Sequence, residues 1–153
     1  MSKLLTILIP VYNTEKYLQK CINSLLIGGF TDKFEILIVI DGSPDNSIQI
    51  ANKFKNQYPK SIHVINKINA GHGSTINEGL KIAKGKYFRV LDSDDWFNRK
   101  SFSSFLSKLE LTEADLVMSH MTEHFVYKKT HKRKSHSDFI FDKIYNSENI
   151  IYT

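Results

Sequence analysis

The chain has 153 residues, of which 41% are apolar and 24% are charged, and this composition is typical of a globular domain. The length suffices for one domain with its own core, and no apolar run approaches the about 20 residues that a membrane-spanning helix needs. The lone cysteine, Cys21, excludes an internal disulfide. Its place in an apolar helical pattern predicts a core thiol rather than a nucleophile. Together these features predict a cytoplasmic protein.

The net charge of +5 comes from one segment rather than from a generally basic surface. Outside this segment, sixteen basic residues balance sixteen acidic ones. The segment contains Lys128, Lys129, Lys132, Arg133 and Lys134. Such a patch can meet anionic lipid headgroups at the inner face of a membrane, a phosphate-rich acceptor or nucleic acid. A solvated loop is an equally good interpretation of the same pattern.

Strand-like and helix-like segments alternate through residue 120. Runs rich in β-branched, aliphatic and aromatic residues predict strands at residues 5–9, 34–40, 62–65, 86–91 and 115–120. Amphipathic spacing and capping residues predict helices at residues 14–27, 43–58, 74–84 and 98–109. Thr14, Ser43 and Ser74 are the predicted N-caps, and Gly28 and Gly85 are predicted to follow helix ends.

The predicted second strand is apolar throughout, which is typical of a strand buried on both faces of a parallel sheet. Alternation with helices therefore predicts an α/β fold over residues 1–120, a three-layer α/β/α sandwich with a mostly parallel sheet. The alternation ends after His120. In residues 121–153, the segments 125–127 and 139–141 are predicted to form a hairpin on either side of the basic cluster.

Distinctive residues follow each of the first four predicted strands. They are Pro-Val-Tyr-Asn at 10–13, Asp-Gly-Ser at 41–43, Asn-Ala-Gly-His-Gly at 69–73 and Asp-Ser-Asp-Asp at 92–95. In a parallel sheet these segments meet at one edge, where open α/β folds bind ligands. These segments suit a nucleoside diphosphate. The aromatic ring would contact the base, the carboxylate a base N–H group, the small residues would allow close approach, and a cation at the acidic cluster would bind the pyrophosphate. Each segment alone also fits a packing aromatic, a turn or ordinary loop geometry.

The acidic run Asp92, Asp94 and Asp95 has two interpretations. Three carboxylates in four positions repel one another unless a cation or hydrogen-bond donors lie between them. A hard divalent cation that shares its ligands with phosphate oxygens fits this pattern. Alternatively, the run is an acidic turn that caps the helix from Asn98 onward. A dinucleotide fingerprint is excluded because Ile76 stands where its third glycine belongs, and the chain contains no Walker A sequence.

These segments resemble the nucleotide-sugar-binding half of an inverting family 2 glycosyltransferase with the GT-A fold. The resemblance covers residues 4 to about 120 and rests on residues 5–13, 37–47, 69–79, 85–87 and the Asp-x-Asp-like run at 92–95. It implies transfer of a sugar from a UDP-sugar, or another nucleotide sugar, to a polysaccharide, glycoconjugate or lipid-linked acceptor. The implied reaction is a direct displacement with inversion, assisted by a metal and by a general base.

The resemblance also implies roles for particular residues. Asp41 would accept a hydrogen bond from the nucleobase, while Tyr12 and the backbone of Pro10 and Val11 would line the base and ribose. Asp94, together with Asp92, would bind Mg²⁺ or Mn²⁺ on the diphosphate. The full set of implied donor-binding residues is Pro10, Val11, Tyr12, Asn13, Glu15, Asp41, Ser43, Asn69, Gly71, His72, Gly73, Asp92 and Ser93.

Two features depart from the family pattern. Thr75-Ile76-Asn77 replaces the usual Ala-Arg-Asn, so the arginine is missing, and His72 is a candidate to compensate by hydrogen bonding. The chain is also shorter than the family's catalytic domains, so the general base is expected beyond Thr153. A donor-binding fragment without turnover is therefore one alternative function, and a basic membrane or nucleic-acid adaptor is another, although no nucleic-acid partner is expected. An incomplete sheet with an exposed edge would favour self-association.

Overall fold

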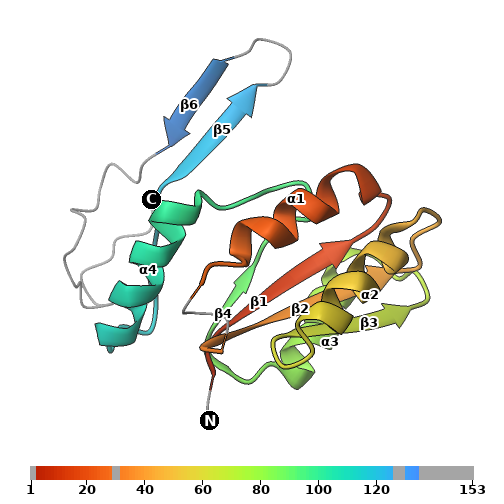
Figure 1. Ribbon diagram of the computed structural model, residues 1–153, viewed down its shortest axis with the longest axis horizontal. Coiled ribbons are helices and arrows are strands. Elements are labelled where there is room, and N and C mark those ends of the chain that lie inside the picture. Colours follow the sequence, from red (N-terminus) through yellow and green to blue (C-terminus); the bar gives the residue numbers. More distant parts are fainter. Residues whose placement is uncertain (1–2, 29–31, 126–129, 135–153) are drawn as a thin grey trace. The chain divides into compact units, whose positions relative to one another are not determined.

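The computed structural model describes residues 3–28, 32–125 and 130–134 (Figure 1). The chain divides into two compact units, Met1–Leu111 and Thr112–Thr153. Among the described residues, no helix has both the length and the apolar character needed to cross a membrane.

The first unit contains a four-stranded sheet in which all neighbouring strands are parallel. Its strands are β1 (Lys3–Val11), β2 (Phe34–Asp41), β3 (Ile62–Lys67) and β4 (Gly85–Val90), in the order β3-β2-β1-β4. The central strand β1 therefore pairs with β2 on one side and with β4 on the other. The carboxyl ends of all four strands lie at one edge of the sheet, as the sequence predicts.

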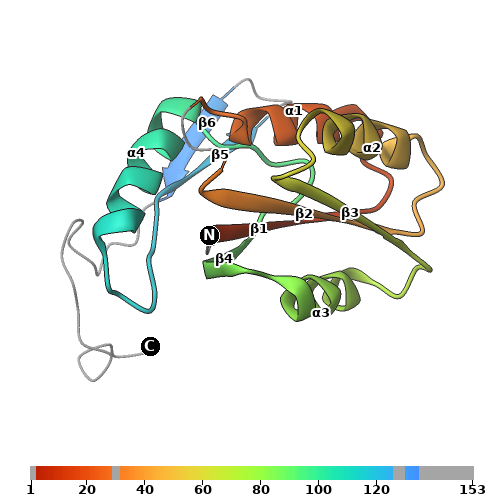
Figure 2. The ribbon, with the colours of Figure 1, turned by 60° about the horizontal axis from the view of Figure 1, so that its bottom comes forward.

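Helices cover both faces of this sheet. Figure 2 shows α1 (Glu15–Leu25) and α2 (Ser47–Gln57) on one face and α3 (His72–Ile82) on the other. The last helix of the unit, α4 (Arg99–Leu111), lies beside α1. The predicted three-layer α/β/α sandwich is confirmed.

The core lies between the sheet and these helices. All eight residues of β2 are buried, as expected for a central strand covered on both faces. On the α3 side, Leu8, Leu37 and Val39 form a cluster against which Ile76 packs. Gly79 lets α3 approach the sheet closely, because a Cβ atom there would lie 2.5 Å from a methyl carbon of Leu8.

Aromatic packing and hydrogen bonds from Arg99 join α4 to the rest of the unit. The fully buried ring of Phe102 meets Phe34 edge to face, with ring centroids 5.8 Å apart. Arg99 donates hydrogen bonds from its guanidinium to the backbone carbonyls of Asn23 and Leu26 at the end of α1. The helix α1 ends at Leu25, earlier than the end predicted from Gly28.

Of the three predicted N-caps, Thr14 stands at the N-cap position of its helix, whereas Ser43 and Ser74 do not. Thr14 precedes α1 but makes no side-chain capping bond, and Asn46 rather than Ser43 precedes α2. The Ser43 hydroxyl is instead bonded to a neighbouring loop. Gly71 rather than Ser74 precedes α3, with a φ of 87°. Glycine suits that position because other residues rarely adopt a positive φ.

The predicted fifth strand at residues 115–120 is wrong. The second unit has no regular structure from 112 to 120, and there the Leu116 side chain is 70% exposed and that of Met118 is 39% exposed. An apolar run becomes a buried strand only when neighbouring elements cover it, and these two side chains are exposed.

The second unit contains an antiparallel hairpin whose position differs from the prediction. Its strands are β5 (Met121–Phe125) and β6 (Thr130–Lys134), so three of the five basic residues belong to a strand instead of to the connecting loop. Pairing of Met121 with Lys134 sets the register. Residues 126–129 and 135–153, which include Lys128, Lys129 and the predicted strand at 139–141, lie outside the described residues.

We expect Phe102→Ala to lower the free energy of unfolding by about 3–5 kcal/mol, because it removes a fully buried ring and leaves a cavity under α4. Urea unfolding followed by circular dichroism measures this change. Leu111→Ala, at an 87% exposed position on the same helix, is the control and should change stability by less than about 0.5 kcal/mol. Equal effects of the two changes would contradict the packing described for α4.

Candidate functional site

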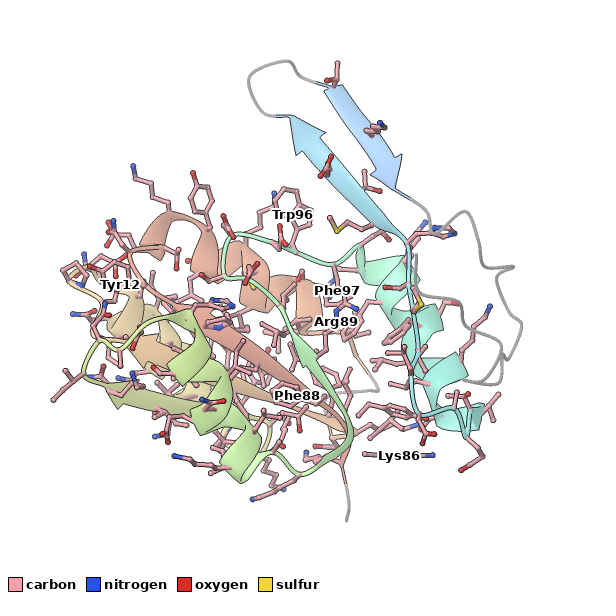
Figure 3. The ribbon with its side chains drawn as sticks, turned by 180° about the vertical axis from the view of Figure 1, so that it is seen from behind. Tyr12, Lys86, Phe88, Arg89, Trp96 and Phe97 are labelled. Carbon is pink, nitrogen blue, oxygen red and sulfur yellow. The ribbon has the colours of Figure 1, made fainter. Side chains whose placement is uncertain are left out.

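The four loops that follow β1, β2, β3 and β4 contain the residues predicted to form the site. Figure 3 shows Tyr12 and Trp96 beyond the carboxyl ends of β1 and β4, whereas Lys86 lies near the opposite end of β4. Val11 is buried at the end of β1, and the Tyr12 side chain that follows it is 53% exposed. The edge therefore presents an accessible aromatic ring on a buried strand.

The loops after β1 and β2 are joined by hydrogen bonds. Asn13, which has a positive φ of 55°, donates its backbone N–H to the Ser43 hydroxyl at 2.8 Å. The Ser43 hydroxyl in turn donates to Asp45 at 2.6 Å. Asp45 also accepts the backbone N–H groups of Glu15 at 2.8 Å and Ser47 at 3.1 Å. The first turns of α1 and α2 are thus tied to one carboxylate.

Glu15 completes a reciprocal arrangement between the two helices. Its carboxylate accepts both the backbone N–H and the side-chain amide of Asn46, at 2.9 and 3.0 Å. Each helix start is therefore capped by an acid from the other loop, which also complements the helix dipoles. This contact gives Glu15 a structural partner, and its predicted place among the donor-binding residues stays a prediction.

Asp41, at the end of β2, joins the loops after β2 and β3. Its side chain is almost fully buried, and Lys67 donates to Oδ1 at 2.5 Å. The backbone N–H of Ala70 also reaches Oδ1, at 3.0 Å, and that of Gly71 reaches Oδ2, at 2.8 Å. Burial raises the pKa of the Asp41 carboxyl, but these three hydrogen bonds and the charge of Lys67 outweigh burial, and the pKa lies below its ordinary value.

A close backbone approach reinforces this junction. Gly42 has a φ of 63°, and a Cβ atom at this position would lie 2.8 Å from the backbone nitrogen of Asn69. Only glycine satisfies both the conformation and the contact. The predicted residues Asp41, Asn69 and Gly71 are therefore brought together, and the glycine between β2 and its loop is part of the reason.

The acidic run after β4 has a different electrostatic character. Ser93 is buried, while the side chains of Asp92, Asp94 and Asp95 are exposed. Partial burial, followed by the charges of Asp94 and Asp92, raises the pKa of the Asp95 carboxyl above its ordinary value. The mutual repulsion expected of these residues is therefore present, and a cation would relieve it.

The acidic run does not cap the next helix. Asn98 does so, because its side-chain oxygen accepts the backbone N–H of Ser101 at 3.1 Å. Among the residues that the structure describes, no three acidic, histidine or cysteine side chains form a group that could hold a metal ion. A cation bound at Asp94 and Asp92 would thus need ligands besides the described acidic, histidine and cysteine side chains, such as phosphate oxygens or water.

Cys21 lies beneath the acidic run. Its side chain is 1% exposed, and its thiol lies 3.7 Å from the backbone oxygen of Asp92, to which it donates. Burial, and to a smaller extent the charges of Asp95, Asp94 and Asp92, raises the pKa of the Cys21 thiol to about 12. The prediction of a core thiol rather than a nucleophile is confirmed.

The position of the missing arginine is filled by a core residue. Ile76 packs on the cluster formed by the sheet and α3, and Thr75 is buried and donates its hydroxyl to the backbone oxygen of His72. His72 itself is exposed at the first position of α3, next to the exposed Gly73. A cationic contact from position 76 is therefore absent from this chain.

Sequence reasoning missed Lys67, Asp45 and Arg89. Lys67 stands opposite Asp41 in the register of β3 and β2, which no sequence pattern reveals. Asp45 could have been found from the sequence, because an acid that follows the Asp-Gly-Ser-Pro turn and precedes a helix is a candidate for capping that helix. Arg89 is half-buried in β4, with its guanidinium 5.3 Å from the ring of Phe97 (Figure 3).

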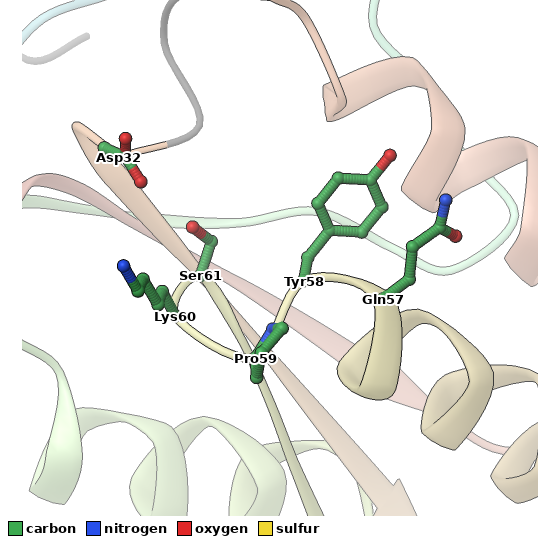
Figure 4. A pocket seen from close by; sticks show the side chains of 6 residues that line it. All are labelled: Asp32, Gln57, Tyr58, Pro59, Lys60 and Ser61. Carbon is green, nitrogen blue, oxygen red and sulfur yellow. The ribbon is translucent and has the colours of Figure 1, made fainter.

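A separate hollow lies at the opposite edge of the sheet. It encloses about 230 Å³ where α2 ends and β3 begins (Figure 4). Its lining residues are Asp32, Gln57, Tyr58, Pro59, Lys60 and Ser61. It contains none of the predicted site residues, because those follow the carboxyl ends of the strands.

Comparison with known proteins gives the class to which this fold and this edge belong. A sequence model described as glycosyl transferase family 2 matches residues 6–152, so the chain belongs to that family. The chain is 36% identical over 117 residues to EpsJ, an uncharacterized glycosyltransferase of Bacillus subtilis (strain 168), with 76% of this chain and 33% of EpsJ covered.

Solved structures show the same fold. The chain is similar to residues 1–349 of TarS from S. aureus in complex with UDP, with a TM-score of 0.63 and 30% identity over 71% of this chain and 32% of that chain. TarS is a poly(ribitol-phosphate) beta-N-acetylglucosaminyltransferase. The mannosyltransferase PcManGT from Pyrobaculum calidifontis, in complex with GDP-Man and Mn²⁺, has a TM-score of 0.61 at 17% identity over 69% of this chain and 32% of that chain, and shares the fold.

The likeness to these glycosyltransferases confirms the predicted GT-A fold. The chain spans about a third of the length of EpsJ and of the TarS fragment. The family and the fold of this chain are therefore shown. The described residues include the four loops that follow β1, β2, β3 and β4.

We expect Gly42→Ala to displace Asn69 and to lower the free energy of unfolding by about 1–3 kcal/mol, because the new methyl group meets a backbone atom at a positive φ. Gly28→Ala is the matched control, since a Cβ atom there has nothing within 4 Å. Thermal and urea unfolding of both variants measure the difference. Equal stabilities would show that the contact between Gly42 and Asn69 is not tight.

We expect Asp45→Asn to lower the free energy of unfolding by about 1 kcal/mol at neutral pH, through weaker capping of α1 and α2. Burial opposes ionisation, but hydrogen bonds from Ser43, Glu15 and Ser47 lower the pKa of Asp45 from 3.8 to about 2. The stability that its ionisation contributes is complete above about pH 4 and is lost as the pH falls through about 2.

The difference between wild type and Asp45→Asn should therefore shrink between about pH 4 and pH 2. Urea unfolding at a series of pH values measures it. The exposed Asp115→Asn change is the control and should stay within about 0.5 kcal/mol of wild type throughout. A difference for Asp45→Asn that is constant down to pH 2 would rule out its ionisation as the cause.

Proposed function

We propose that the carboxyl edge of the β1–β4 sheet is the donor site of a glycosyltransferase and that it binds a UDP-sugar or a related nucleotide sugar. The observation that carries this proposal is the junction at Asp41, which fixes the loops after β2 and β3 in one arrangement. The similar protein TarS has been solved with UDP and with UDP-GlcNAc, which supports uridine nucleotides as the donor class.

Different residues at this edge are proposed to contact the base, the ribose and the phosphates of the nucleotide. The exposed ring of Tyr12 and the backbone of Pro10 and Val11 line the base and ribose. Asp41 accepts an N–H group of the base on Oδ2, which receives one hydrogen bond from the protein and has a further lone pair. The start of α3 has no side-chain cap, so the exposed residues His72 and Gly73, which come before the bonded Ser74 N–H, are suited to phosphate oxygens.

The acidic run fits a divalent cation. Asp94 and Asp92 are exposed oxygen donors beside Asp95, whose pKa is raised by partial burial and then by their charges, and this gathering of negative charge suits Mg²⁺ or Mn²⁺. These two residues would hold the ion. When bound, the ion supplies Lewis-acid stabilisation of charge on the departing nucleoside diphosphate.

The reaction is proposed to be a direct displacement with inversion at the sugar carbon. An acceptor hydroxyl attacks while a general base removes its proton. We assign no described residue to that base. The acceptor is a polysaccharide, glycoconjugate or lipid-linked saccharide, and the basic residues Lys132, Arg133 and Lys134 in β6 suit an anionic acceptor or the inner face of a membrane.

We expect UDP to bind this chain in calorimetric titrations with Mn²⁺, and we expect chelator or Asp94→Asn to weaken binding at least tenfold, or about 1.4 kcal/mol. Asp32→Asn, at an exposed acid before the amino end of β2, is the control and should bind as wild type does. A folded wild-type chain that binds no UDP would contradict the proposal. UDP binding without turnover of UDP-sugars would indicate a donor-binding fragment.

A further inference from the structure

Lys67 is the last residue of β3 and stands opposite Asp41 in the strand register. Its ammonium group has three N–H donors. They reach Asp41 Oδ1 at 2.5 Å, the backbone oxygen of Ile68 at 2.7 Å and the Ser74 hydroxyl at 2.8 Å. The Lys67 and Asp41 side chains are 18% and 5% exposed, so the ion pair is largely shielded from water.

These contacts close the loop between β3 and α3 at both ends. At one end Lys67 and the loop N–H groups of Ala70 and Gly71 converge on Asp41. At the other end the Ser74 hydroxyl, which accepts from Lys67, donates to the backbone oxygen of Gly71 at 2.9 Å. The loop is therefore held between one ammonium group and one carboxylate.

We propose that Lys67 is a positioning residue for the nucleobase end of the donor site. This inference rests on the proposed function, because it concerns the same edge of the sheet. Lys67 fixes the Asp41 carboxylate and the loop at residues 68–71 before the nucleotide arrives. Its three donors are already used within the protein, so it acts on the base through Asp41 and does not contact the diphosphate.

Removal of Lys67 should therefore affect the two ends of the nucleotide differently. Without its ammonium partner, the buried Asp41 carboxylate loses its counter-charge, and the loop loses its tie to Ser74. Base recognition depends on both. The acidic run after β4 is part of neither contact. The first turn of α3 also keeps the bonds from the Ser74 N–H to the Gly71 oxygen and from the Thr75 hydroxyl to the His72 oxygen, so an inorganic diphosphate with Mn²⁺ should bind as before.

The experiment compares UDP with inorganic pyrophosphate, each with Mn²⁺, by calorimetry on wild type and Lys67→Met. We expect UDP to bind the variant at least tenfold more weakly and pyrophosphate to bind within twofold of wild type. The control is Lys81→Met, which removes an exposed lysine on α3 that pairs with Glu78. Both ligands should bind this control within twofold of wild type.

Three results would overturn the proposal. Unchanged UDP binding to Lys67→Met would show that Lys67 does not position the base site. Equal losses for UDP and pyrophosphate would indicate a general structural role. A folded wild-type chain that binds pyrophosphate but not UDP, or neither, would overturn the proposed function, and the role of Lys67 with it.

A second set of variants keeps the test decisive if Lys67→Met fails to fold. The double change Asp41→Asn with Lys67→Met removes both charges of the buried pair. Because Lys67 acts through Asp41, we expect the double variant to bind UDP within twofold of Asp41→Asn alone. Multiplied losses would contradict action through Asp41. Lys67→Arg, which keeps the charge, should recover part of the affinity lost in Lys67→Met.

Discussion

The buried carboxylate of Asp41 is the interaction on which the arrangement of the site depends. Alone at the end of a buried strand it would be unfavourable, since burial penalises its charge. Three donors from the next strand and loop remove that penalty, and in doing so they fix the loop. The contacts that stabilise the buried carboxylate therefore also hold the loop between β3 and α3 in place at the edge of the sheet.

The edge contains acids in two contrasting electrostatic situations. Asp41 and Asp45 are surrounded by donors that lower their pKa values, and both are used to join loops. The pKa of Asp95 is raised by partial burial and, to a smaller extent, by the charges of Asp94 and Asp92, which the charge of Arg89 offsets only in part. Satisfied carboxylates give a rigid frame after β1, β2 and β3, whereas the unsatisfied ones after β4 are suited to an added cation. A nucleoside diphosphate with a metal ion requires both the loops that hydrogen-bonded carboxylates hold in place and exposed acids that can bind the metal.

Much of the fold could be predicted from the sequence because periodicity and burial are coupled. The apolar run of β2 and the helix–strand alternation give the parallel sheet and its layers. The strand predicted at residues 115–120 is wrong, because Leu116 and Met118 lie in a strand-like run but their side chains are exposed. Helix starts were misplaced because Ser43 and Ser74 have capping chemistry, but their hydroxyls donate to the Asp45 carboxylate and to the backbone oxygen of Gly71.

The candidate site was predictable to a similar degree. Residues at strand ends could be found because parallel strands bring their ends together, and this reasoning located Asp41, Asn69 and Gly71. The partner of Asp41 could not be found, because it depends on the register that places Lys67 opposite it. The capping role of Glu15 likewise depends on the contact between two loops that are distant in sequence.

Amide chemical shifts in a two-dimensional nitrogen–proton spectrum, recorded with UDP and Mg²⁺, test the central claim most directly. The claim predicts that the largest changes fall on backbone amides of the strand-end loops, Asn13, Gly42, Gly71 and Asp94 among them. Amides at the opposite edge, such as Lys60 and Ser61 beside the separate hollow, should change little. Changes concentrated at that opposite edge, or a folded chain that shows none, would contradict the assignment of the site.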